Sequence, residues 1–226
     1  MPGSIYKTFV IEERYGFNKT TAGTFVKDEV KTYILTMVMF AMLIPLILWV
    51  IEKSGTAMIP SLAGIVIAAI IIFQLLFPTV IIPIFYSLTD LEDGKLKTSI
   101  YAEAKKTDID VSEIKVIDGS QRSSHSNAFV AGLCGARKVV IFDTLIEQNS
   151  QEEIIAVVNH ELGHVAYKHI IKNTIAACIQ MIVMFSVFSF TLGNKGILLS
   201  FGFSYESKYV YLLIFQNMWA PVTFIT

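Results

Sequence analysis

The sequence predicts a mainly helical, multi-span membrane protein with about four transmembrane helices and a small α+β insert between them. Composition is the first reason, because 54% of the 226 residues are hydrophobic and only 16% are charged, against about 25% charged in soluble domains. Several long runs without a charged side chain are the second reason. The net charge of −1 gives no ground for expecting a nucleic-acid partner. Two cysteines are too few for a disulfide scaffold.

The first two predicted transmembrane helices lie within residues 32–89. Residues 1–31 before them are mixed and charged, so we expect a cytosolic N-terminal segment rather than a signal peptide. Residues 32–51 are uncharged and about as long as a bilayer core demands. A second uncharged run covers residues 54–89. The lipid bilayer is therefore an expected partner.

Residues 90–172 hold the stretch that is long and polar enough to fold outside the lipid. Apolar residues at helical spacing and β-branched runs indicate its elements. They predict first an amphipathic helix over 93–106 and a strand over 114–117. A hairpin of strands 127–133 and 138–142 follows, with its turn at Cys134-Gly135-Ala136. The last element is a helix from Gln151 that can continue into the next span. This order predicts an α+β insert beside the membrane.

Two further spans are expected within residues 173–226, at 173–194 and 209–226. Basic residues indicate the orientation, because cytosolic segments beside membrane helices are rich in Lys and Arg. Residues 1–31 and 84–172 together hold 15 of the 18 basic residues. We therefore expect both segments to face the cytosol.

The motif HELGH at residues 160–164 carries the predicted chemistry. Four residues advance a helix by about 400°, so His160 and His164 lie one turn apart on one face and can bind one zinc ion. Glu161 can accept a proton from zinc-activated water and pass it to the leaving amine of a cleaved peptide. A chance match on a surface turn is the alternative. A buried His-Glu-His cluster without a metal would, however, leave polar groups unsatisfied.

A catalytic zinc takes three protein ligands, and the third is not evident in the sequence. His169 follows His160 by nine residues, about 900° around a continuous helix. It is therefore predicted to lie on the opposite face, near the lipid headgroups. Glu206 is the only Glu after Glu161, and it falls in a loop expected on the far side of the membrane. Neither residue is a good third ligand.

Six stretches in a fixed order are spread over nearly the whole chain, from residue 8 to residue 221. They are TFVIEERYGFNKTT (8–21), LEDGKLK (91–97), DGSQRSSHSNAFVAGL (118–133), RKVVIFDTLIE (137–147), NHELGHVAYKHIIKN (159–173) and FGFSYESKYVYLLIFQNMWAP (201–221). With these stretches the sequence resembles the type I CAAX prenyl endopeptidase family of membrane zinc proteases. The combination of HELGH with RSSHSNAF and KVVIFDTLI makes the resemblance highly specific.

The resemblance implies a zinc metalloendopeptidase that removes the C-terminal tripeptide of prenylated CAAX proteins. It implies a multi-pass protein of the endoplasmic reticulum membrane, with a zincin-like catalytic region facing the cytosol. By position, His160 and His164 would bind one zinc ion and Glu161 would be the general base. Asn127 and Ala128 match the family's edge strand, which pairs with an extended substrate. A strand-end polar cap is the alternative role for Asn127.

Two residues near this strand have simple explanations and no implied role. His125 is expected to be a hydrogen-bonded loop residue, and Arg122 could equally be a solvated surface charge.

The resemblance further places the third zinc ligand, a Glu, on a helix beyond Thr226, and two more membrane helices before Met1. We therefore expect an internal fragment that binds zinc weakly and hydrolyses little.

Two other functions remain open from the sequence. One is a membrane quality-control metalloprotease of the same superfamily, which would cut misfolded membrane proteins without a prenyl group. The other is a non-catalytic membrane fragment or pseudoenzyme, which is considered because one zinc ligand is missing. The stretches RSSHSNAF and ERYGFN favour the prenyl endopeptidase over both.

Overall fold

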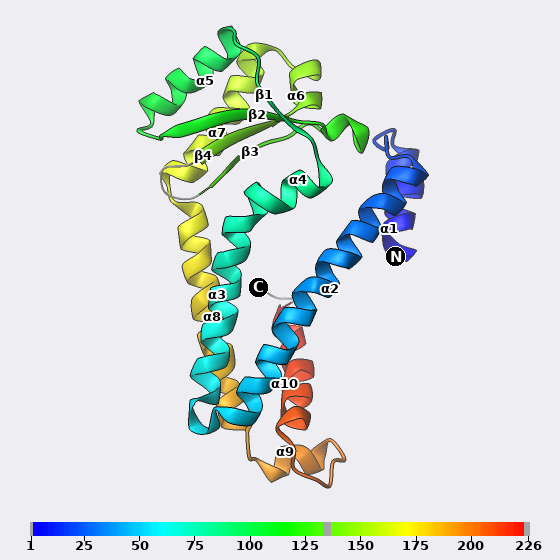
Figure 1. Cartoon of the computed structure of the whole chain (residues 1–226), viewed down its shortest axis with the longest axis vertical. Coiled ribbons are helices and arrows are strands. Elements are labelled where there is room, and N and C mark those ends of the chain that lie inside the picture. The colour runs from blue at the N-terminus through cyan, green and yellow to red at the C-terminus, as the bar shows by residue number, and fades with distance from the viewer. Residues whose placement is uncertain (1, 133–136, 224–226) are drawn as a thin grey trace. The chain divides into compact units, whose positions relative to one another are not determined.

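The computed structural model describes residues 2–132 and 137–223, and these form two compact units. The first unit contains Met1–Met37 and Ile72–Ile171, and the second contains Val38–Ile71 and Lys172–Thr226. Three helices are long and apolar enough to cross a membrane (Figure 1). They are α2 (Ala22–Lys53), the helix Met58–Phe85 and α8 (His169–Thr191). The second of these consists of α3 (Met58–Leu76), the π-helical turn Phe77–Ile81 and α4 (Ile82–Phe85).

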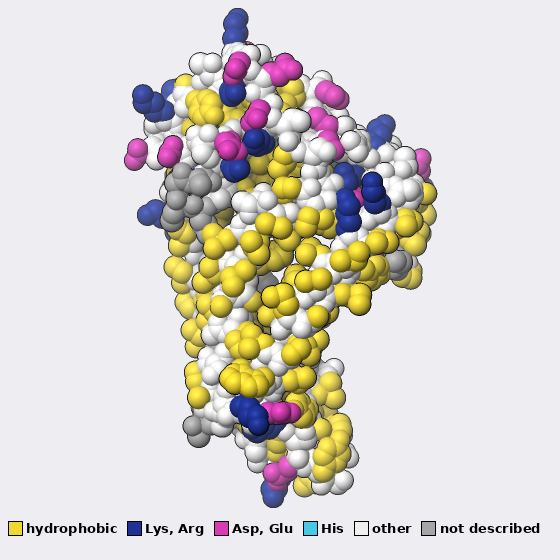
Figure 2. Space-filling model, viewed as in Figure 1, with side chains coloured by type: hydrophobic (Ala, Val, Ile, Leu, Met, Phe, Trp, Pro, Cys, Tyr) yellow, Lys and Arg dark blue, Asp and Glu magenta, His cyan; other side chains and the backbone are white. Residues whose placement is uncertain are grey.

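These three helices largely coincide with the first three uncharged runs that the sequence predicts as spans. Figure 2 shows hydrophobic side chains covering the visible face of the long helices. Many of these side chains are exposed, among them Met37, Phe40 and Met42, as expected for helices whose natural solvent is lipid. The fourth predicted span falls on α10 (Lys208–Thr223), which has 16 described residues. This length is short for a bilayer crossing, so the fourth span stays a prediction.

The second unit has its own apolar core, formed where the ends of helices meet. It includes parts of α2, α3 and α8 together with α9 (Lys195–Ser200) and α10. Within it, the Lys208 ammonium donates to the Ile51 carbonyl at 2.9 Å, and the Tyr209 hydroxyl donates to the Glu52 carboxylate at 2.8 Å. The buried residues of this core are Val50, Ile51, Met58, Leu62, Phe185, Phe188, Leu198, Val210, Tyr211, Ile214 and Phe215.

The first unit contains a four-stranded mixed sheet with the order β1-β2-β4-β3. β1 and β2 are antiparallel, β2 and β4 are parallel, and β4 and β3 are antiparallel. Among the described strands, β1 and β3 therefore form the two edges of the sheet. The strands are β1 (Leu88–Asp90), β2 (Val111–Ile117), β3 (Ala128–Ala131) and β4 (Arg137–Phe142).

Helices cover one face of this sheet (Figure 1). They are α5 (Lys95–Lys106), α6 (Asp143–Gln148) and α7 (Gln151–Ala166). Successive residues of β4 alternate between the two faces, as a strand requires. Val139 and Ile141 join the core under the helices, whereas Val140 packs with Ile82 of α4 on the other face. The N-terminal segment adds α1 (Pro2–Tyr6) and a π-helical turn, Lys7–Glu12.

Most of the expected elements of the insert are confirmed. The helix over 93–106 is α5, the strand over 114–117 is part of β2, and the two hairpin strands are β3 and β4. The predicted hairpin turn at Cys134-Gly135-Ala136 lies outside the described residues. The sequence pattern did not reveal β1, which has only three residues, or α6.

One expectation about the helix that begins at Gln151 is wrong. It does not continue into the membrane span, because α7 ends at Ala166 and α8 begins at His169. Lys168 between them has a φ of +55°. A residue in this left-handed conformation ends an α-helix and redirects the chain.

Candidate metal centre

A capping box fixes where α7 begins. The Ser150 hydroxyl accepts from the Glu153 backbone N–H at 3.4 Å, and the Glu153 carboxylate accepts from the Ser150 backbone N–H at 2.8 Å. These bonds satisfy donors that a helix N-terminus otherwise leaves without partners. Donation from the Ser150 backbone and side chain to the carboxylate lowers the pKa of Glu153. The HELGH motif therefore begins on the third turn of a well-capped helix.

Apolar residues fix the rotation of α7. Ile154, Val158 and Leu162 recur every four residues and are at most 1% exposed, packed into the core against the sheet. His160 and His164 are offset by two residues from this stripe, which is about 200° around the helix. Burial of the stripe consequently leaves both imidazoles on a face outside the core, where they are exposed.

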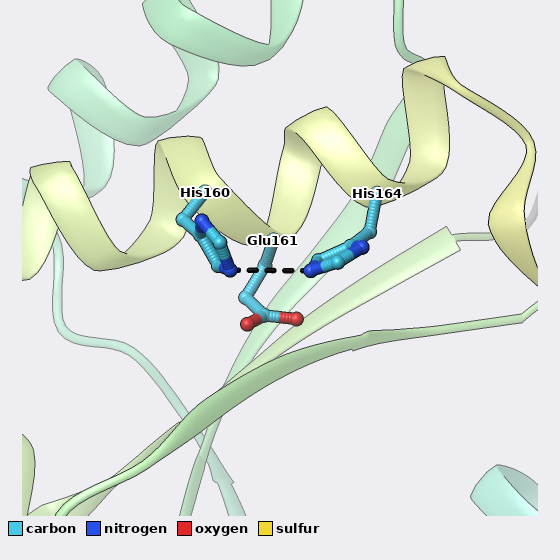
Figure 3. A group of neighbouring side chains, drawn as sticks. All are labelled: His160, Glu161 and His164. Carbon is cyan, nitrogen blue, oxygen red and sulfur yellow. Dashed lines mark hydrogen bonds between the residues drawn. The ribbon is translucent and has the colours of Figure 1, made fainter.

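The side chains of His160, Glu161 and His164 converge beside α7 (Figure 3). The Nε2 atoms of the two imidazoles face each other at 3.1 Å. One ligand atom from each of the three side chains lies within 4.8 Å of the others. Glu161 is half-buried, whereas the histidines are exposed. The structure thus brings together the three residues that the motif predicts.

This arrangement fits a zinc ion. Two imidazole nitrogens that bind tetrahedral zinc at about 2.0–2.1 Å lie about 3.3 Å apart. The observed separation of the two Nε2 atoms, 3.1 Å, is close to that value. Imidazole nitrogens and carboxylate oxygens are also both donors that zinc binds. Among the described residues, this is the group of His, Cys, Asp and Glu side chains that could hold a metal.

The structure corrects the expected position of His169. Its Nδ1 lies 2.6 Å from Nδ1 of His164, and the two ring centroids are 4.9 Å apart. The expectation of an opposite face assumed one continuous helix. Because the chain turns at Lys168, His169 returns to the side of α7 that carries His164.

Glu206 belongs to the second unit, where its carboxylate pairs with the Lys195 ammonium at 2.9 Å. It is not among the residues grouped around His160.

The segment that precedes β3 is held by several long-range contacts. The Asp143 carboxylate accepts hydrogen bonds from the backbone and the hydroxyl of Ser120. The buried Thr144 hydroxyl donates to the His125 carbonyl at 3.0 Å, and the His125 ring stacks on Phe17 with centroids 4.2 Å apart. His125 is thus a hydrogen-bonded loop residue, as expected.

Arg122, in the same segment, is not a solvated surface charge. Its side chain is only 17% exposed, and it pairs with Asp28 of α2. The guanidinium also donates to the Phe85 carbonyl and lies 4.3 Å from the centre of the Tyr86 ring. Donation of hydrogen bonds to the Asp28 carboxylate is the main cause that raises the pKa of Arg122 further above its ordinary value. The sequence gave no signal for this partly buried ion pair.

The two predicted substrate-binding residues lie at the start of edge strand β3. The Asn127 side-chain oxygen accepts from the Ala128 backbone N–H at 2.9 Å, so Asn127 makes the contact of a strand-end cap. Ala128 is 2% exposed. Little of Ala128, main chain included, is therefore accessible while Asn127 covers its N–H.

The main chain of β3 presents one row of polar groups to β4 and another to the open edge. The Asn127 carbonyl accepts from the Phe142 backbone N–H at 3.0 Å, so Asn127 faces β4. In an antiparallel pair this orientation alternates along the strand. Ala128 and Val130 therefore direct their main-chain groups away from β4, toward the open edge. Val130 is a candidate binding residue that the sequence alone did not indicate.

An apolar cavity adjoins the same strand. Aromatic side chains from the helix Met58–Phe85 form one side, including Phe73 and Phe77, and Phe129, Val130 and Ala131 of β3 form the other. Its volume is about 310 Å³. Since α7 packs against β3, the candidate metal-binding residues, the edge strand and the cavity belong to neighbouring elements of one unit.

Comparisons with known proteins give a consistent result. The family described as "CAAX prenyl protease N-terminal, five membrane helices" matches residues 1–87, and "Peptidase family M48" matches residues 90–226. The chain is 34% identical to CAAX prenyl protease 1 homolog of Oryza sativa subsp. japonica over 98% of its own length and 52% of the rice protein. It is 35% identical to the probable CAAX prenyl protease 1 of Schizosaccharomyces pombe over 100% of its own length and 48% of that protein.

A solved structure shares the fold. The crystal structure of S. mikatae Ste24p matches with a TM-score of 0.89 and 32% sequence identity, covering 98% of this chain and 55% of that chain. The chain spans about half the length of the curated relatives it matches. The M48 match includes the HELGH helix and extends over more than half of the chain. These matches confirm the resemblance seen in the motifs, and the chain belongs to peptidase family M48.

Proposed function

We propose that this chain carries the catalytic region of a zinc metalloendopeptidase that removes the C-terminal tripeptide of prenylated CAAX proteins. The observation that carries the proposal is the convergence of His160, Glu161 and His164 beside an open edge strand. We infer a multi-pass protein of the endoplasmic reticulum membrane with this region facing the cytosol, because the basic residues concentrate in residues 1–31 and 84–172.

The residues of α7 divide the chemistry between them. His160 and His164 would hold the metal through their Nε2 atoms, whose separation supports this role. Zinc, when bound, supplies a Lewis acid for water and for the substrate carbonyl. Glu161 then takes a proton from the attacking water and returns it to the leaving amine. A catalytic zinc takes a third protein ligand in addition to the two imidazoles.

We infer that the substrate binds as an extra strand on β3. The main-chain groups of Ala128 and Val130 point toward the open edge, and an extended peptide can pair with such an edge. Val130 is the more accessible of the two, because Ala128 is only 2% exposed. The side chain of Asn127 accepts a hydrogen bond from the Ala128 N–H. When a peptide binds, this side chain would either move aside or mark the point on β3 where pairing with the peptide stops. The cavity bounded by Phe73, Phe77 and Phe129 is apolar, which suits the aliphatic residues or isoprenoid of a prenylated C-terminus.

Peptide cleavage tests this proposal. The protein, expressed from its complete coding sequence and purified in detergent, is offered a farnesylated CAAX peptide and the same peptide without farnesyl. We expect release of the C-terminal tripeptide from the farnesylated peptide at the higher kcat/KM. Equal or better cleavage of the unprenylated peptide would instead support a membrane quality-control protease, and failure to cleave either would support a non-catalytic protein.

A further inference from the structure

We propose that His169 is a positioning residue, which holds the imidazole of His164 in the tautomer and orientation that a metal requires. This inference rests on the proposed zinc site. It starts from the contact between Nδ1 of His164 and Nδ1 of His169, at 2.6 Å. The contact joins the first residue of α8 to the last turn of α7.

The two nitrogens of His164 have different neighbours. Nε2 faces Nε2 of His160 at 3.1 Å, on the side where the metal would lie. Nδ1 faces His169. Since the two nitrogens point to opposite sides of an imidazole ring, His169 lies behind His164 as seen from the metal position. His169 is therefore placed to contact a ligand rather than to be one.

The location of one proton follows from this geometry. To bind a metal, Nε2 of His164 needs a free lone pair, so the ring proton must be on Nδ1. That Nδ1–H then donates to Nδ1 of His169, which accepts. The reverse direction, from His169 to His164, would leave the proton of His164 on Nε2 and block the metal. A metal-binding His164 that keeps this contact thus requires His169 to be the acceptor.

The break between α7 and α8 makes this contact possible. The Tyr167 and Lys168 backbone N–H groups close the end of α7 by donating to the Gly163 and Val165 carbonyls, at 3.0 and 2.9 Å. Lys168 then adopts its positive φ and turns the chain. The Tyr167 ring stacks on His169 with an interplanar angle of 22°, which limits the rotation of the His169 ring. The turn therefore supplies a partner that a continuous helix could not.

Two substitutions separate hydrogen bonding from packing. His169→Asn keeps an acceptor, because Oδ1 of Asn is as many bonds from the backbone as Nδ1 of His. His169→Phe keeps a flat ring that can stack on Tyr167 but has no acceptor. A matched control is His125→Phe, which removes an imidazole that stacks on Phe17 and is not part of the metal group.

The readout is zinc affinity of the purified protein, expressed from its complete coding sequence and measured by competition with a chromophoric chelator. Loss of a hydrogen-bonded partner of a metal ligand typically weakens metal binding about 10–100-fold. We expect a loss of this size for His169→Phe, recovery to within about threefold of the parent for His169→Asn, and no change for His125→Phe. Helix content and unfolding temperature, measured by circular dichroism, should be unchanged in all three variants.

The outcomes distinguish this inference from the proposed function. Equal affinities of the parent and His169→Phe would show that water replaces His169 without loss, and would overturn the inference while leaving the zinc site intact. Strong binding by the Phe variant with weak binding by the Asn variant would show that packing matters, and would also overturn it. A parent protein, expressed from its complete coding sequence, with no measurable zinc affinity would contradict both the proposed metal site and the inference.

Discussion

Arg122 and Asp28 form a two-pronged ion pair between residues 94 positions apart in the sequence. Nε of Arg122 donates to one carboxylate oxygen at 2.7 Å, and Nη2 donates to the other at 3.1 Å. Asp28 belongs to α2, and Arg122 belongs to the segment that leads into β3. The pair therefore connects a membrane helix to the segment that precedes β3, the edge strand that we expect to bind substrate.

Asp28→Asn tests how much this ion pair contributes to stability. The substitution removes the negative charge from a guanidinium that is only 17% exposed. Loss of a partly buried charged hydrogen-bond partner typically costs about 1–3 kcal/mol. We expect a decrease of this size in the free energy of unfolding, measured by denaturant titration in detergent. Asp93→Asn is the control, since Asp93 pairs with Lys97 but is 95% exposed, and we expect a change below about 0.5 kcal/mol. Equal effects of the two substitutions would contradict a structural role for the buried pair.

Val130→Pro tests the binding of substrate to the edge of the sheet. Proline lacks a backbone N–H, and edge strands tolerate it where that N–H points away from the sheet. We expect the variant to fold and to cleave the farnesylated peptide with a raised KM, because one main-chain donor to the substrate is lost. Val130→Ala, which keeps the donor, should retain a KM near that of the parent. A parental KM in the proline variant would exclude strand addition at this residue.

Glu161→Gln separates catalysis from metal binding. The amide cannot accept a proton from water, so we expect kcat to fall by about 10²–10⁴-fold. The imidazoles of His160 and His164 are unchanged, so the zinc content should stay close to that of the parent. Rates of peptide cleavage and metal analysis on the same preparation check both expectations. If Glu161→Gln cleaves as fast as the parent, Glu161 is not the general base.

The capping box of α7 predicts a pH dependence of stability. Hydrogen bonds from Ser150 lower the pKa of Glu153 below its ordinary value of 4.5. The carboxylate therefore stabilises the folded state above that value, and the contribution is lost as the pH falls through the lowered pKa. We expect amide hydrogen exchange at the start of α7 to become faster as the pH drops through this window, after correction for the intrinsic rate.

Glu153→Gln is the matched control for this effect, because its amide oxygen can still accept from Ser150 without titrating. Its corrected exchange rates should not depend on pH in the same window. Parallel pH profiles for the parent and Glu153→Gln would show that another group causes the acid sensitivity.

Regular periodicity explains which features could be predicted from the sequence. The four-residue recurrence of Ile154, Val158 and Leu162 indicates a helix and also determines which face it buries. The positions of His160 and His164 relative to that stripe follow from the same geometry. For this reason both α7 and the convergence of the candidate metal-binding residues were predictable without a structure.

Other features depend on single residues or distant partners and leave no periodic signal. The left-handed turn at Lys168 is one example, because this conformation usually selects Gly or Asn. The prediction for His169 failed at this turn. The pairing of Arg122 with Asp28 is another, because it depends on tertiary contacts between segments far apart in the sequence. The open main-chain groups of Val130 became visible only from the register of β3 on β4.

The central claim is that His160 and His164 bind one metal ion together. X-ray absorption spectroscopy of the zinc-loaded protein tests it most directly, with His160→Ala and His164→Ala as comparisons. We predict zinc–nitrogen distances of about 2.0–2.1 Å with scattering from two imidazoles in the parent, and from one fewer in each variant. A parent spectrum without imidazole scattering, or one that neither substitution changes, would contradict the claim.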